Sequence, residues 1–455
     1  MPLGRRLPSR TPRAGERVPR PDPCHHRVVS PSPEPSSAEL RIERVPWEAL
    51  RGLAPALDGP LSEVLSGAPA ERVVDRLLRR LGPLEPPQRT ALSEAVFGVG
   101  LWRRRLRAQL GMPGAPPRLL VASLLRDLGG RGDAAALASL DPAALPPPRP
   151  APRALADRCS LPDWLAAEIL RAAGDQAAAL AEALNHPGPV CLRPNLLRTS
   201  AEALEARLAA GGVATSPGRL VPSCRLASGR LNVYGLGAFQ EGLLEVQDEG
   251  SQLMGALLEA RPGEEVLDAC AGAGGKALLL AAAVGAGGRV HAVDPDEERL
   301  LRLRGRAERA GAGGIVALHG ARPPAGLAVD RALVDAPCSE LGALRRGPDL
   351  RWRIDPDGFA ALPALQLAVL EGAARSVRPG GRLVYATCTF RREEDEEVAR
   401  AFERAHPELV RRRPEFAGAA LDPDGFVRTW PHRHGTDGFF GAVWDLASPS
   451  ARRSW

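Results

Sequence analysis

The chain has 455 residues, of which 44% are hydrophobic and 4% aromatic, and its formal net charge is +6. This length predicts two to four domains, and the longest apolar run, around Ala277–Gly285, is too short to cross a bilayer. No signal peptide is expected, because the arginines near the start have no apolar stretch behind them. The seven cysteines stand far apart without zinc-ligand spacing, so we expect no metal and free thiols in a reducing cytoplasm. The mild basic excess suits a polyanionic partner.

The first 154 residues divide into three regions by composition. Residues 1–38 are rich in Pro, Arg and Ser, which predicts a disordered basic arm. Residues 39–140 carry apolar side chains at three- and four-residue spacing, as in 71–81 and 88–106, which predicts an all-helical domain. Residues 141–154 are rich in Pro and Ala and predict a semi-rigid linker.

Two further domains are expected after this linker. Residues 155–240 mix helical stretches, at 164–173 and 201–211, with short strand-like pieces, which predicts a small α+β domain. Residues 241–446 alternate apolar strands with helices, which is typical of a parallel α/β sheet, and 447–455 form a tail. The five expected strands of this sheet are Glu265–Ala269, Arg289–Val293, Gly314–Leu318, Arg331–Val334 and Arg382–Ala386.

A glycine-rich loop, Asp268–Lys276, follows the first of these strands. Glycines there allow the backbone to approach a ligand closely at the carboxyl edge of the sheet. Asp294, after the second strand, is placed to accept hydrogen bonds from the ribose hydroxyls of a nucleoside cofactor. The same loop satisfies a loose dinucleotide pattern, so an NAD-dependent oxidoreductase is an alternative. Asp268 argues against it, because an acid suits an amino-acid moiety and a sulfonium better than a pyrophosphate.

The composition singles out Lys276. All basic residues except this one are arginines. Since arginine replaces lysine at most solvated positions, the single lysine indicates a site that needs a compact ammonium.

Two cysteines follow the fourth and fifth expected strands. Cys338 comes three residues after Asp335, and Cys388 ends the run that begins at Tyr385. Both should lie at the sheet edge that carries the glycine loop. A thiolate that adds to carbon 6 of a cytosine makes carbon 5 able to attack a methyl sulfonium, and Cys is a suitable covalent catalyst for this addition. Asp335 would hold the base, and Lys276 would supply positive potential near it.

These residues resemble the bacterial 16S ribosomal RNA cytosine-C5 methyltransferases of the Sun/Rsm family over roughly residues 45–445. Leu161–Trp164 and Leu192–Asn195 are similar to the start of the family's small RNA-binding subdomain, and the helical region before them resembles its NusB-like domain. The motifs that carry the resemblance in the C-terminal half are Val246–Leu253, Leu267–Lys276, Asp330–Ser339, Arg345–Trp352, Leu383–Thr389 with Glu393–Glu396, and Pro431–Phe440.

The resemblance implies a Rossmann-like class I fold that uses S-adenosyl-L-methionine. It implies that Cys388 is the nucleophile and that Cys338 assists product release. The implied partner is 16S ribosomal RNA, free or in early assembly, and the implied enzyme is a cytoplasmic monomer without a metal or a membrane partner. The residues expected to touch the cofactor are Cys270, Ala271, Gly272, Ala273, Gly274, Gly275, Lys276, Asp294 and Asp335.

The sequence departs from the family pattern at three places. Gly320 stands where an aspartate near the adenine is usual, Gly272-Ala273 replaces Ala-Pro, and Asp395 replaces Asn. Gly320 is the feature that favours a catalytically silent RNA-binding assembly factor, and transfer RNA or DNA are alternative substrates.

The target cytosine has to be unstacked before a thiolate can reach it, which favours a flipped or single-stranded base. Five residues between the two cysteine strands are expected to grip the RNA. They are Arg345, Arg346, Arg351, Trp352 and Arg353.

Overall fold

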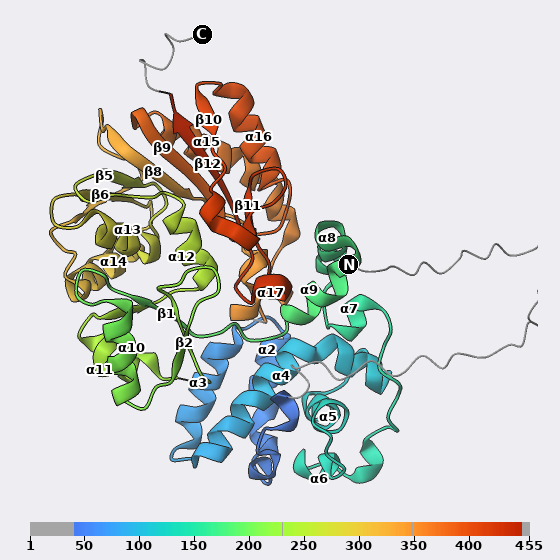
Figure 1. Cartoon of the computed structure of the whole chain (residues 1–455). Coiled ribbons are helices and arrows are strands. Elements are labelled where there is room, and N and C mark those ends of the chain that lie inside the picture. Colours follow the sequence, from blue (N-terminus) through green and yellow to red (C-terminus); the bar gives the residue numbers. More distant parts are fainter. Residues whose placement is uncertain (1–40, 230, 348, 448–455) are drawn as a thin grey trace, which may run out of the picture. The chain divides into compact units, whose positions relative to one another are not determined.

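The computed structural model describes residues 41–229, 231–347 and 349–447, which belong to one compact unit, Ser36–Trp455 (Figure 1). The arm expected at 1–38 and most of the expected tail lie outside the described residues. Within the described ranges, no helix combines the length and the apolar character that a membrane span requires.

The N-terminal region is all-helical, as the apolar spacing predicts. Its longest helix, α4 (Pro86–Leu110), begins with a capping box between Glu85 and Gln88 and ends at Gly111, which has φ +66°. The apolar face of α4 is buried against its neighbours in one continuous core. The other helices are α2 (Asp58–Leu65), α3 (Ala70–Leu81), α5 (Pro117–Ser123), the π-helical η3 (Leu124–Leu128) and α6 (Ala134–Leu137).

The middle region is an α+β domain with an antiparallel sheet in the order β2-β3-β1-β4. The last strand, β4 (Leu244–Val246), lies beyond residue 240 and pairs with β1 (Cys191–Pro194). The other elements are β2 (Thr215–Pro217), β3 (Arg225–Ala227), α7 (Leu155–Arg158), α8 (Asp163–Ala173), α9 (Ala177–Ala183), α10 (Ala201–Ala210) and α11 (Gly237–Gln240).

The C-terminal region is a doubly wound α/β fold, so the expected Rossmann-like class is confirmed. Its core strands run parallel in the order β7-β6-β5-β8-β9, which brings the first and fourth strands side by side. All five expected strands are present. They are β5 (Glu265–Asp268), β6 (Arg289–Val293), β7 (Val316–His319), β8 (Val329–Asp335) and β9 (Val377–Thr387).

The sheet continues beyond the five expected strands at one edge, where the added strands are antiparallel. β12 (Phe439–Leu446) runs antiparallel to β9, and β10 (Leu409–Arg411) and β11 (Val427–Thr429) pair with β12. The partners of this edge are far apart in the sequence, and an apolar run alone does not state its direction. The sheet is therefore mixed.

Helices cover both faces of this sheet (Figure 1). Two consecutive residues of β5, Val266 and Leu267, belong to different apolar clusters, because successive side chains of a strand point to opposite faces. The first cluster includes α12 (Glu249–Ala256), α13 (Gly275–Val284) and α14 (Glu297–Ala310), and the second includes α15 (Leu362–Ala374) and α16 (Glu396–Ala405).

Candidate active site

The two cysteines meet because β8 and β9 are parallel neighbours. Asp335 pairs in register with Ala386, so both strands end at the same edge of the sheet. The Sγ atoms of Cys338 and Cys388 lie 3.4 Å apart, and the backbone N–H of Cys388 donates to the Cys338 sulfur over 3.4 Å. Both thiols are free and only partly buried. The sequence-predicted pair is thus brought together in space.

Hydrogen bonds fix the two loops that carry these cysteines. The Ser339 and Thr389 hydroxyls are 2.8 Å apart, and the Ser339 N–H donates to the buried Glu394 carboxylate over 2.9 Å. The Gly342 N–H donates to the Cys388 carbonyl over 3.0 Å. These contacts limit how far either sulfur can move.

The surroundings of Cys388 favour its protonated form. Its hydrogen bond to Cys338, its burial and the negative charge of Asp335 raise the pKa of the Cys388 thiol well above its usual value. Attack by this sulfur therefore requires a group that takes its proton, and the Cys338 sulfur is in contact with it.

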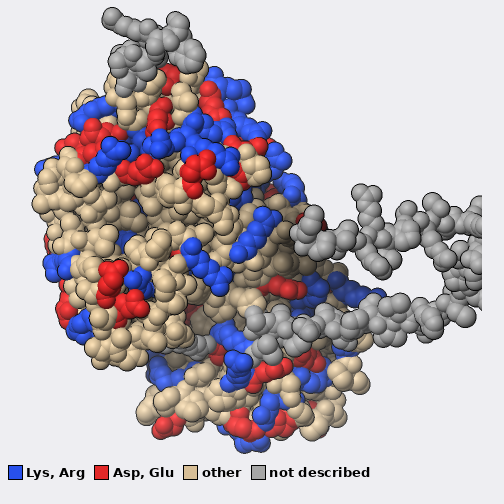
Figure 2. All heavy atoms as spheres, in the orientation of Figure 1, with Lys and Arg blue, Asp and Glu red and all other residues tan. Residues whose placement is uncertain are grey.

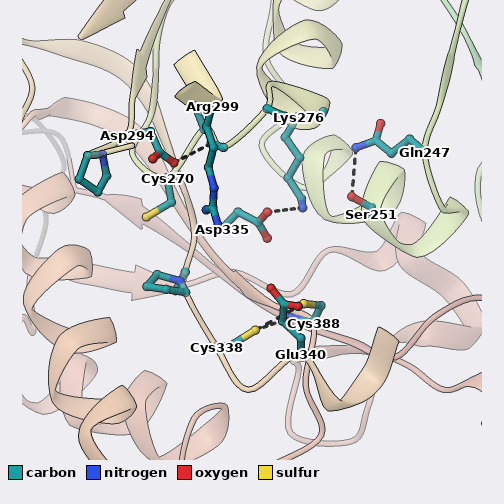
Figure 3. A pocket seen from close by; sticks show the side chains of 17 residues that line it. Gln247, Ser251, Cys270, Lys276, Asp294, Arg299, Asp335, Cys338, Glu340 and Cys388 are labelled. Atoms are coloured by element: carbon teal, nitrogen blue, oxygen red, sulfur yellow. Dashed lines mark hydrogen bonds and ion pairs between the residues drawn. The ribbon is translucent and has the colours of Figure 1, made fainter. Parts of the chain in front are cut away.

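The thiols line a cavity of about 380 Å³ together with the glycine loop, Asp294 and Asp335. Figure 3 shows the two sulfurs side by side, with the Lys276–Asp335 pair facing them. All of the sequence-predicted site residues except Gly274 line this cavity, and Gly274 is buried beneath the loop. Six polar or ring side chains of its wall were not predicted as site residues from the sequence, namely Gln247, Ser251, Pro295, Arg299, Pro337 and Glu340.

Gln247 and Ser251 could have been found, since they lie in the motif Val246–Leu253 and their side chains bond each other over 3.0 Å. Arg299 and Glu340 carried no comparable signal. They reach the cavity from the start of α14 and from the residue before the 3₁₀ helix η7 (Leu341–Arg346), positions that the sequence alone does not place near the thiols.

Two glycines give the cofactor loop its shape. Gly272 and Gly274 have φ +54° and +89°, the left-handed region that glycine adopts without strain. A Cβ atom on Gly274 would lie 2.0 Å from Cδ1 of Leu303. The Gly272 N–H donates to the Asp294 carboxylate over 2.9 Å, so this acid anchors the loop as well as facing the cavity.

The small α+β domain also holds this loop. The buried Arg193 of β1 donates to the Gly275 carbonyl over 2.5 Å. Arg306 of α14 donates to the Ala273 carbonyl over 2.6 Å and to Glu245 of β4 over 2.8 Å. The backbone carbonyls of the loop are thereby satisfied, and its inner surface stays available to a ligand.

Lys276 forms an ion pair with Asp335, with Nζ 2.6 Å from the carboxylate. The ammonium is almost fully buried and lies 5.4 Å from the centre of the Phe439 ring. A compact ammonium can lie between this ring and this carboxylate as a single point charge, whereas a guanidinium is a broad planar group. This difference gives a physical reason for lysine at this position.

Asp268 is buried at the entrance of the loop. Neither carboxylate oxygen has a hydrogen-bond partner among the described residues. Burial and then the charge of Asp335 raise its pKa to about 7. A carboxylate without a partner suits a cationic amino-acid moiety, and Asp294 is placed to accept hydrogen bonds from ribose hydroxyls. S-adenosyl-L-methionine has both of these groups.

The expected RNA grip between the cysteine strands is wrong for its buried members. Arg351 is fully buried and donates to the Asn185 side chain over 2.6 Å and to the Leu184 carbonyl over 3.0 Å. Trp352 lies under the guanidinium of Arg103, whose centre is 4.1 Å from its ring. Most of this segment therefore serves packing, because its charges find partners inside the fold.

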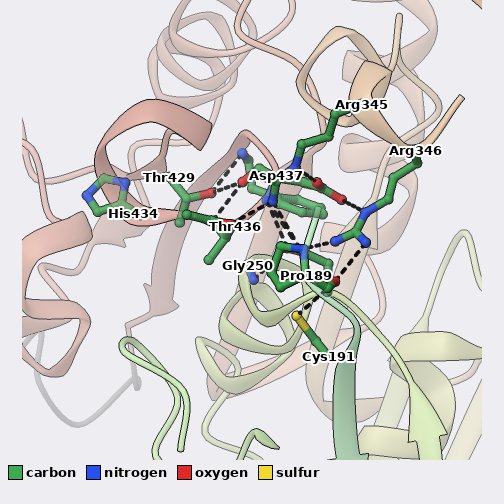
Figure 4. Close-up of polar contacts among 12 residues, drawn as sticks. Pro189, Cys191, Gly250, Arg345, Arg346, Thr429, His434, Thr436 and Asp437 are labelled. Carbon is green, nitrogen blue, oxygen red and sulfur yellow. Dashed lines mark hydrogen bonds and ion pairs between the residues drawn. The ribbon is translucent and has the colours of Figure 1, made fainter. Parts of the chain in front are cut away.

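Arg345 and Arg346 belong to an arginine–aspartate cluster with Asp248 and Asp437 (Figure 4). Arg345 reaches Asp437 over 2.5 Å, and Arg346 reaches Asp437 over 2.8 Å and Asp248 over 2.6 Å. Burial, followed by the charge of Asp437, raises the pKa of Asp248. The cluster joins residues of the motifs at 246–253, 345–352 and 431–440.

The two other departures from the family pattern have different settings. Asp395 is fully buried, accepts from the Thr387 hydroxyl over 2.6 Å and pairs with Arg428 at 2.9 Å. Burial nevertheless raises the pKa of Asp395 to about 7. Gly320 is exposed, and an added side chain would meet nothing within 4 Å. The space for the usual aspartate is therefore open at this position.

Comparison with known proteins places these features in a family. Residues 255–445 match the 16S rRNA methyltransferase RsmB/F family, and residues 161–232 match its RsmF/B-like ferredoxin-like domain. The chain is 34% identical to the probable ribosomal RNA small subunit methyltransferase B of Bacillus subtilis, over 63% of this chain and 67% of that protein. It is 33% identical to ribosomal RNA small subunit methyltransferase B of Vibrio cholerae, over 63% and 66%.

Solved structures show the same architecture. The crystal structure of PH0851 has a TM-score of 0.70 and 26% identity, and the match covers 88% of this chain and 99% of that one. A methyltransferase homologue from Pyrococcus horikoshii has a TM-score of 0.56 and 26% identity, over 64% and 97% of the two chains. The class I methyltransferase fold of the C-terminal region is thus supported independently of its motifs.

We expect Asp268→Asn to change how stability depends on pH. The raised pKa means that the folded protein holds a proton between pH 4 and pH 7 that the unfolded chain has released, so the free energy of unfolding falls as the pH rises through this window. Asn removes that fall and should raise the free energy of unfolding at pH 8 by up to about 4 kcal/mol. Urea unfolding at several pH values measures this, with the exposed Asp357→Asn as control. An unchanged slope would show that Asp268 is already paired.

We expect Asn185→Ala to destabilise the protein by about 2 kcal/mol, because it leaves the buried Arg351 without one of its acceptors. Thermal and urea unfolding measure the loss. Asp357→Ala, at an exposed residue shortly after this segment, should change the free energy of unfolding by less than about 0.5 kcal/mol. Equal effects of the two substitutions would contradict the packing role assigned to Arg351.

Proposed function

The chain belongs to the RsmB/F family of 16S ribosomal RNA methyltransferases, and from this premise we propose that it transfers a methyl group from S-adenosyl-L-methionine to carbon 5 of a cytosine in 16S ribosomal RNA. The observation that carries the proposal is the pair of thiols 3.4 Å apart, in one cavity with the glycine loop and the Lys276–Asp335 ion pair. Each of these groups has a role in the proposed reaction.

Carbon 5 of cytosine is too weak a nucleophile to take a methyl group directly. The cofactor supplies an electrophilic methyl group when bound. The protein's task is to raise the electron density at carbon 5, and covalent addition of a thiolate to carbon 6 does this.

Cys388 forms the bond to carbon 6 in this proposal. As it attacks, its proton passes to Cys338, which has to be in its thiolate form and is in contact with it. Cys338 then releases this proton to solvent through the cavity, so that its thiolate is restored for the later step. The electron pair displaced from the ring moves to nitrogen 3, which takes a proton from the Lys276–Asp335 pair. Asp335 also accepts a hydrogen bond from the cytosine amino group, which orients the ring. Carbon 5 would thereby be able to take up the methyl group of a bound cofactor, whose sulfur would keep the electron pair of the broken bond and leave as a neutral sulfide.

Cys338 completes the reaction. Its thiolate removes the hydrogen of carbon 5 as a proton, the bond between carbon 6 and Cys388 breaks, and the nitrogen-3 proton returns to the Lys276–Asp335 pair. The two sulfurs thus act in sequence on neighbouring carbons of one ring, Cys388 at carbon 6 and Cys338 at carbon 5. This requires the two sulfurs to lie close together.

In this proposal the two domains before the methyltransferase domain bind and position the RNA. The ferredoxin-like region is directly bonded to the cofactor loop through Arg193, so a bound RNA can be positioned relative to the methyl donor. The helical region is assigned a NusB-like role in RNA binding. We further propose that the protein acts as a monomer in a reducing cytoplasm, an environment that suits reactive thiols.

Labelled methyl transfer to 16S ribosomal RNA tests the roles of the thiols. We expect Cys388→Ala to abolish transfer and Cys338→Ala to trap a covalent RNA–protein adduct that survives denaturing electrophoresis. Cys159→Ala is the control, since Cys159 is a free buried cysteine that does not line the cavity, and this variant should keep most of the activity. Full activity of Cys388→Ala would refute the mechanism, and mapping the methylated base decides between ribosomal and transfer RNA.

We expect Lys276→Arg to lower kcat by more than about 100-fold, although the charge is kept, because the guanidinium cannot take the place of the ammonium at Asp335. Steady-state kinetics with varied RNA and cofactor measure this. Arg299→Lys is the control, because it exchanges the same two residue types in the opposite direction at the half-exposed rim of the cavity. This variant should change kcat by less than about threefold. Equal kcat values for Lys276→Arg and the wild type would remove the lysine from the mechanism.

A further inference from the structure

A second basic site lies away from the thiols, in a groove of about 730 Å³ between the C-terminal half of α4, the segment 145–154 and Trp352. Four arginines line this arginine groove, namely Arg103, Arg104, Arg107 and Arg149. On the face of the molecule shown in Figure 2, basic and acidic side chains are interspersed, so overall charge does not single out a binding surface there. The partners of each arginine are the better guide.

Arg104 is neutralised inside the fold. It reaches Asp157 over 2.6 Å and Asp163 over 2.7 Å, and it donates to the Leu161 carbonyl over 2.8 Å. Its role is to attach α4 to the α+β domain.

The other three arginines form no ion pair with any carboxylate that the structure describes. Arg103 is 8% exposed and donates only to the Leu65 carbonyl, over 3.3 Å. Arg107 has a buried Nε without an acceptor. The nearest acid to Arg103, Asp349, is already bonded to the Ala70 N–H and to Arg353. Three positive charges therefore share one groove with little compensation.

The arginines repel one another in this arrangement. Burial, and then the charge of Arg107, lower the pKa of Arg103 to about 10. The carbonyl end of α4 attracts cations and so helps to gather them there. Arg149 comes from a different segment and folds over this end, since a Cβ on Gly111 would lie 2.0 Å from its Nη1. An anion in the groove would relieve the repulsion.

We propose that this arginine groove binds the phosphate backbone of the RNA at a point distinct from the cytosine pocket. This rests on the proposed RNA substrate. Arginine forks match phosphate oxygens in pairs, and several guanidiniums along one groove suit a repeating phosphodiester better than a single small anion. One face of Trp352 is covered by Arg103, which favours contact with phosphates over stacking of bases. The contact is therefore independent of sequence.

Binding of a fluorescent oligouridylate to the full chain tests the proposal, because this probe contains no cytosine for the thiol pocket. We expect Arg107→Gln with Arg149→Gln to weaken binding by about tenfold at moderate salt. The log–log dependence of affinity on salt should become shallower by about 1.5 to 2. Arg149→Gln alone, at an exposed side chain, should give about half of the change in slope and keeps the test valid if Arg107→Gln unfolds the helix.

Arg79→Gln is the matched control, since Arg79 is exposed, lies in the same helical region and is paired with Asp75. An unchanged salt slope in the Arg149 and double variants would overturn the proposal, and so would displacement of the probe from the wild type by polyglutamate at equal charge concentration, which would indicate an acidic polypeptide as the occupant. Groove-dependent oligouridylate binding without methyl transfer to any RNA would refute the proposed activity and leave the groove in place.

Discussion

The site depends on the parallel pairing of β8 with β9. This pairing sets Asp335 opposite Ala386 and sends both chains off the same sheet edge, so that the next residues of each can meet. Without it, Cys338 and Cys388 are fifty positions apart and unrelated. The bonds of Ser339, Glu394 and Gly342 then hold the two departing loops at one separation. The proposed reaction uses two sulfurs in succession on one ring, so it depends on this strand order.

Buried charged side chains in this fold are of two kinds, those that form ion pairs inside the protein and those that do not. Asp395 and Arg428, or Arg345 and Asp437, are buried as ion pairs, and their removal should cost stability. Asp268 is buried without a partner, which costs stability in the absence of ligand. A group that destabilises the empty protein and lies beside the cofactor loop is best explained by the ligand that compensates it.

The sequence could predict what depends on local pattern. Alternating apolar strands, the glycine loop and the positions of the two cysteines at strand ends all follow from spacing along the chain. The antiparallel β12 and the burial of Arg351 could not be predicted in this way, because their partners are distant. Arg351 bonds Asn185, which lies 166 positions earlier, and a run of arginines in a sequence looks like solvated surface. Gln247 and Ser251 lie within the motif Val246–Leu253, which could have pointed to them, and the fold places both on the cavity wall.

The partners of each arginine therefore carry information that its mere presence does not. All basic residues but one are arginines, so residue type does not distinguish a structural cation from a binding one. Arg104 and Arg107 lie three positions apart on α4, yet the first pairs with Asp157 and Asp163, whereas the buried Nε of the second has no hydrogen-bond partner among the described residues. A desolvated guanidinium without a carboxylate costs free energy unless something else supplies the negative charge. In a protein of this family the polyanion at hand is RNA, and the uncompensated arginines mark where its backbone would lie.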